Sequence, residues 1–72
     1  MKEEFVEILS RYTGLDAGAI GPDLLLARYC YDLDLVEMAM ILEEEFGVAI
    51  PNEMLEGPLT AGELWAYISE AL

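Results

Sequence analysis

The 72-residue chain contains no histidine and only one cysteine, and both absences restrict its chemistry. Without histidine it lacks the commonest general base, the imidazole metal ligand and the usual partner of a nucleophilic serine. Ser10 and Ser69 fall inside expected helices with no base beside them, so we do not expect an enzyme. A single cysteine cannot form an internal disulfide, which fits a reducing cytosolic compartment.

Basic residues are scarce as well. Three Lys and Arg side chains stand against 15 Asp and Glu, for a formal charge of −12, and no basic residue follows Arg28. This charge repels phosphates and anionic lipids, so we expect neither nucleic acid nor a membrane as a partner. Basic protein surfaces are the natural counterparts, and mutual repulsion between copies favours a monomer.

Long apolar runs are also absent. No stretch approaches the ~20 residues that a membrane span requires, and the acidic start does not have the pattern of a signal peptide. We therefore expect a soluble cytoplasmic protein. A chain of this length buries only about 60% of its unfolded surface, which is enough for one small core. Residues 1–72 are expected to form a single domain.

Apolar periodicity predicts an all-α fold with three main helices, one short helix and a long loop between the first two main helices. The first helix should run from about Lys2 to Tyr12 and end at Gly14. The loop that follows carries several glycines and a proline, and we expect a short helical turn from Leu24 to Arg28. A loop this long must be held to the core. The residues predicted to hold it are Leu15, Ile20, Leu24, Leu25 and Leu26.

The segment from Tyr31 to Ile50 is predicted to contain a strongly amphipathic helix whose exposed side carries only negative charge. Asp32 or Asp34 should cap its start, and Gly47 should end it. Its buried stripe is expected to consist of Leu35, Met38, Leu42 and Phe46.

The last third of the chain predicts two further helices. Asn52 should cap a short helix that runs through Leu55. Thr60 and Glu63 form the sequence pattern of a capping box at the start of the final helix.

Three segments resemble acyl carrier proteins. The second predicted helix contains D-L-D-L-V-E-M, where that family reads D-S-L-D-x-V-E-L. The later segments I-P-N-E-M-L-E and L-T-A-G-E-L-W-A-Y-I are similar to the family's third and fourth helices. The resemblance covers the chain from about Lys2 onward. It implies an acyl-carrier-like bundle that serves fatty acid or polyketide-type metabolism.

The departure from the family concerns its attachment serine, which bears a 4′-phosphopantetheine arm. Aligned without gaps from Phe46 backwards, Asp32 stands at the position of the serine. If Asp32 is matched to the family aspartate instead, the serine is deleted between Asp32 and Leu33. Asp32 and Leu33 are therefore the candidate cofactor-binding positions, and neither offers a hydroxyl. As the sequence stands no cofactor is expected, whereas 4′-phosphopantetheine is expected if the native protein has the serine.

The resemblance also implies that basic surfaces of acyl-processing enzymes dock on the acidic second helix. The candidate contact residues are Asp34, Glu37, Glu43, Glu44, Glu45, Glu53 and Glu56. Two functions stay open. In one, the chain is a docking domain that has given up covalent carriage. In the other, it is a genuine acyl carrier protein whose serine has been mutated or is missing from this sequence.

Two further candidates are weaker. Asp32, Asp34 and Glu37 suggest a calcium loop, but helical periodicity continues where the loop needs a turn glycine, so no metal site is expected. Cys30 has no neighbouring Lys or His to activate it and is expected to be a small apolar side chain in the loop.

Overall fold

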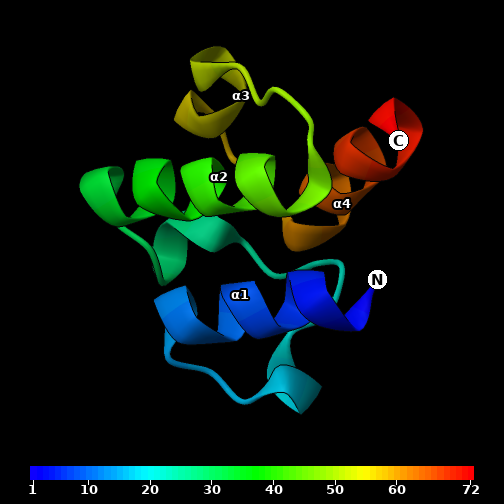
Figure 1. The fold of residues 1–72 in the computed structure, drawn as a ribbon. Coiled ribbons are helices and arrows are strands. Elements are labelled where there is room, and N and C mark those ends of the chain that lie inside the picture. Colours follow the sequence, from blue (N-terminus) through cyan, green and yellow to red (C-terminus); the bar gives the residue numbers. More distant parts are fainter.

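The computed structural model describes residues 1–72 as a bundle of helices without β-strands. The helices lie in the order α1 (Glu3–Thr13), η1 (Ala17–Ala19), η2 (Leu26–Arg28), α2 (Asp32–Phe46), α3 (Asn52–Glu56) and α4 (Ala61–Ala71), where η marks a 3₁₀ turn. Figure 1 shows α1 and α3 on opposite sides of α2, with α4 beside the C-terminal end of α2. The predicted all-α bundle of three main helices and one short helix is confirmed.

The core is built from one apolar stripe on each main helix. All 16 buried residues are apolar, and no charged side chain is buried with them. Trp65 closes one end of this core, with its ring centroid 5.1 Å from that of Phe5 and 5.7 Å from that of Phe46. The fully buried side chains include Phe5, Leu9, Leu26, Met38, Leu42, Leu64 and Ile68. Because these side chains come from helices far apart in the chain, their packing fixes how α2 lies against its neighbours.

The long connection between α1 and α2 is held both by side chains and by its backbone. Ile20 and Leu26 are buried, whereas the other three residues expected to hold the loop are only half-buried. The N–H of Leu26 donates to the carbonyl oxygen of Leu59 at 3.0 Å, and the N–H of Ala61 donates to that of Leu24 at 2.9 Å. These bonds fasten η2 to the start of α4, directly before α2 begins.

Glycine and the capping box act as expected at three helix ends. Gly14 and Gly47 end α1 and α2 with φ values of 75° and 66°, in the left-handed region that glycine adopts without strain. At the start of α4, the hydroxyl of Thr60 accepts the N–H of Glu63 at 3.1 Å, and the carboxylate of Glu63 accepts the N–H of Thr60 at 2.9 Å. These local predictions are confirmed.

The other two predicted caps are wrong. Tyr31 occupies the N-cap position of α2, and Pro51 occupies the N-cap position of α3. Neither side chain makes a capping hydrogen bond. Asp32 and Asn52 are instead the first residues inside their helices. Asp32 and Asp34 still place negative charge in the first turn of α2, where the helix dipole favours it.

No helix of the structure combines the length and the apolar character needed to cross a bilayer.

Candidate functional site

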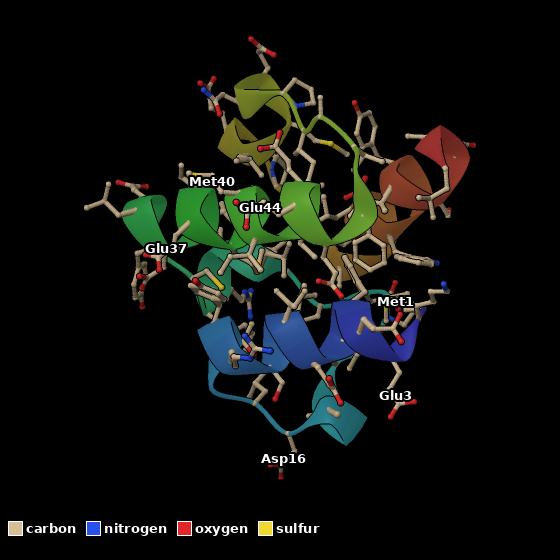
Figure 2. The ribbon with its side chains drawn as sticks, viewed as in Figure 1. Met1, Glu3, Asp16, Glu37, Met40 and Glu44 are labelled. Carbon is tan, nitrogen blue, oxygen red and sulfur yellow. The ribbon has the colours of Figure 1, made fainter.

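The outer face of α2 is the most distinctive exposed surface of the molecule. We define this face by Leu33, Val36, Glu37, Met40 and Glu44, which recur at helical spacing. Figure 2 shows Glu37, Met40 and Glu44 along α2. Leu33 is 83% exposed, Met40 is 59% exposed and Val36 is 42% exposed. The charged side chains of α2 are all negative, as expected, but the prediction of a strongly amphipathic helix is wrong, because α2 is apolar on its outer face as well as its inner one.

Acidic side chains surround these exposed apolar groups. Asp34 and Glu45 are exposed elsewhere on α2, and Glu53 and Glu56 are exposed on the adjacent α3. Neither α2 nor α3 contains a lysine or an arginine. The face is thus apolar in places and uniformly negative around them. Its charge attracts cations, and burial of its apolar side chains against a partner would be favourable.

Glu43 differs from the other candidate contact residues. It is half-buried, and its carboxylate Oε2 accepts the N–H of Ile50 at 2.7 Å. Ile50 is itself only 6% exposed. The Glu43 carboxylate therefore ties the chain that leaves α2 back to the helix, and it is less available to a partner than the neighbouring Glu44.

Glu37 is held by a contact that no local pattern predicts. The hydroxyl of Tyr12, on α1, donates a hydrogen bond to Oε1 of Glu37 at 3.0 Å. Partial burial, and then this carboxylate, raises the pKa of Tyr12, because both disfavour the ionised phenol. Since 25 residues separate the two side chains in sequence, sequence reasoning had no signal with which to find this pair.

The N-terminus of α2 contains the two candidate cofactor-binding positions. Asp32 and Leu33 are both exposed there, directly after the exposed Tyr31. No serine occurs between Ser10 and Ser69. Ser10 lies on α1, where its hydroxyl donates to the carbonyl oxygen of Leu15, and Ser69 lies on α4, where it donates to that of Ala66 at 3.1 Å. Both serines thus have local roles on other helices.

A cavity of about 490 Å³ adjoins this N-terminus and is bordered by α3. Asp32 and Glu56, from different helices, both line it, as does Cys30. Cys30 is 2% exposed, and burial, with a smaller contribution from Asp34, raises the pKa of its thiol. The burial expected for Cys30 is confirmed. Nowhere in the structure are three or more His, Cys, Asp or Glu side chains grouped so that they could hold a metal ion.

Comparison with known proteins agrees with this architecture. The family model for the phosphopantetheine attachment site matches residues 3–68. The acyl carrier proteins of Helicobacter pylori strains G27 and HPAG1 are each 33% identical to the chain over 73 aligned residues, covering 94% of this chain and 90% of the relative. On this evidence the chain belongs to the phosphopantetheine attachment site family of acyl carrier proteins, whose members are carriers and not enzymes.

Proposed function

We propose that this chain is an acyl-carrier-like docking domain that binds basic surfaces of acyl-processing enzymes, and that in this sequence it carries no 4′-phosphopantetheine. The observation that supports docking most directly is the outer face of α2, where Leu33 and Met40 are exposed between acids. Apolar side chains that stay exposed in a folded domain mark an interaction surface when they gather on one face.

The two kinds of side chain on this face have different roles in the proposed complex. Burial of the apolar groups supplies most of the affinity, as it does at the centre of other interfaces. The carboxylates speed the encounter with a basic surface and fix its orientation. Glu37 is suited to this role because the hydroxyl of Tyr12 already orients its carboxylate. The proposed contacts also include Asp34, Glu44, Glu45, Glu53 and Glu56. Glu43 is left out because its carboxylate already accepts the N–H of Ile50.

Absence of the arm is proposed from the chemistry of the attachment position. A phosphopantetheine arm is joined through a hydroxyl oxygen. Asp32 offers a carboxylate there and Leu33 a hydrocarbon, so the residues present do not fit the group. The negative charge of Asp32 also opposes the approach of a phosphate.

Charge reversal on the outer face tests the docking proposal. Glu37→Lys combined with Glu44→Lys should abolish binding to condensing and acyl-transfer enzymes, measured by surface plasmon resonance. The matched control combines Glu3→Lys with Glu70→Lys, which changes the net charge equally on α1 and α4. The control should bind within a few-fold of the unmodified chain. Equal affinity of the two double variants would remove the docking proposal.

A second candidate function is a working acyl carrier protein whose native chain has the attachment serine. The names of the family model and of the relatives favour it. Intact-mass measurement after incubation with coenzyme A and a phosphopantetheinyl transferase separates the two functions. We expect no gain for the chain as given, and a gain of one arm for Asp32→Ser if the surrounding helix is still recognised. A gain on the unsubstituted chain would establish the carrier instead.

The proposal also includes a single domain over residues 1–72, a cytoplasmic location and a monomeric state. The monomer is inferred from the charge of −12, because two copies repel each other unless a large surface is buried between them. Light scattering at low and high salt measures this state. A dimer at low salt would contradict the inference.

A further inference from the structure

The four methionines of the chain differ widely in their access to solvent. Met40 on α2 is 59% exposed and Met1 is 43% exposed. Met54 is half-buried, and Met38 is completely buried in the core. A dissolved oxidant can attack a thioether only where it can reach the sulfur, so Met40 is the most accessible target for methionine oxidation in the folded chain.

Met40 also has a central position on the outer face of α2. Val36 lies four residues before it and Glu44 four residues after it, so each is a neighbour one helical turn away. Figure 2 shows Met40 between Glu37 and Glu44 along α2, whereas Met1 lies at the start of α1, away from this face. The accessible thioether of α2 is therefore part of the apolar surface that the proposed docking function uses.

Oxidation changes the polarity of this position and leaves its charge unchanged. With hydrogen peroxide as the oxidant, the thioether sulfur takes up one peroxide oxygen, an S–O bond forms and the O–O bond breaks. The proton on the transferred oxygen passes to the departing hydroxide, which leaves as water. Methionine loses two electrons and becomes a sulfoxide, and the peroxide gains them. The sulfoxide oxygen accepts hydrogen bonds, so its burial against an apolar partner surface is unfavourable.

We propose that Met40 is a modification site at which peroxide oxidation reversibly weakens docking on the outer face of α2. This inference rests on the proposed docking function, and it holds whether or not the chain carries a prosthetic arm. In the free domain the sulfoxide stays in water, so the fold is retained. In the complex it lies among the side chains whose burial supplies the affinity, and the complex should dissociate faster. Enzymatic reduction of the sulfoxide would restore binding.

Peptide mapping by mass spectrometry after treatment with hydrogen peroxide tests the site itself. In the folded chain Met40 should gain one oxygen atom well before Met54, and Met38 should stay unmodified. In urea the three should react at similar rates, because unfolding exposes every thioether. Oxidation of Met38 as fast as that of Met40 in the folded chain would overturn the proposal.

Surface plasmon resonance on an immobilised condensing enzyme tests the effect on docking. Met40→Leu keeps an apolar side chain but cannot form a sulfoxide, and Met1→Leu is the matched control on the other exposed methionine. After peroxide treatment the unmodified chain and Met1→Leu should each bind about tenfold more weakly, mainly through faster dissociation. Treated Met40→Leu should stay within about twofold of its untreated affinity. An equal loss in the two variants would refute the role of Met40.

Two further measurements separate this inference from its alternatives. The urea midpoint of the oxidised chain should match that of the untreated chain, and incubation with methionine sulfoxide reductases should return the lost affinity. A lowered midpoint would assign the loss of binding to unfolding and refute the proposal. Binding that survives oxidation of Met40 would refute this inference alone. Absence of binding before any oxidation would refute the docking function and this inference with it.

Discussion

Glu43 and Glu44 are adjacent acids with different predicted roles, and replacing each by alanine separates structural from docking carboxylates. Both substitutions remove one negative charge from the last turns of α2 and introduce the same helix-favouring residue. Their effects on charge repulsion and helix propensity therefore nearly cancel in the comparison. What differs is the hydrogen bond of 2.7 Å from the N–H of Ile50, which only Glu43 accepts.

The magnitude follows from that bond. A hydrogen bond to a charged acceptor contributes about 1.5–3 kcal/mol, and the half-buried position of Glu43 favours the lower end of this range. Glu43→Ala should therefore be about 1.5 kcal/mol less stable than Glu44→Ala, since the amide of the buried Ile50 loses its partner. For a domain of this size the difference corresponds to roughly 6–12 °C in Tm.

Urea unfolding followed by circular dichroism at 222 nm measures the difference, with equal m-values expected for the two variants. Hydrogen exchange should show faster exchange of the Ile50 amide in Glu43→Ala alone. Affinity for the partner enzyme should show the reverse order, with Glu44→Ala losing more affinity than Glu43→Ala. A stability difference below about 0.5 kcal/mol, the usual spread of surface substitutions, would refute the role assigned to Glu43.

Three further predictions concern other parts of the fold. Gly62→Ala should cost about 1–2 kcal/mol in urea unfolding, because the new Cβ would lie 2.8 Å from Cβ and 2.9 Å from the carbonyl oxygen of Pro22. Gly18→Ala, which meets nothing within 4 Å, should stay within about 0.5 kcal/mol and is the control. Stability should fall as the pH rises above 10, because unfolded Tyr12 loses its proton before folded Tyr12, whose pKa is raised. The free energy of unfolding of Tyr12→Phe should fall less over the same pH range. Identical dependence on alkaline pH in the variant and the unmodified chain would contradict this. Cys30 should react with a disulfide reagent at pH 8 far more slowly in the folded chain than in urea, because it is buried and its pKa is raised. Equal rates would contradict that burial.

The helix ends and the anchoring of the long loop were predictable from sequence to different degrees. Gly47 and the Thr60–Glu63 pair were found from sequence because each acts on backbone groups within a few residues. Asp32 was misplaced by one position, since an acid suits both the cap and the first turn of a helix. The connection before α2 was expected to be held by leucines, but its backbone bonds to Leu59 and Ala61 depend on where α4 begins.

The sequence by itself determined the order of the three main helices and the short one, the burial of Leu35, Met38 and Leu42 on α2, the negative charge and the resemblance to acyl carrier proteins. These properties are local or additive, so periodicity, capping residues and composition reveal them. Only the tertiary structure decided which acids have fixed partners, because Glu43 is half-buried and accepts the N–H of Ile50, whereas Glu37 accepts the hydroxyl of Tyr12 and stays exposed. It also decided that Asp32 and Glu56 share one cavity. These arrangements join residues that are far apart in the chain, and the packing of the core alone brings them together.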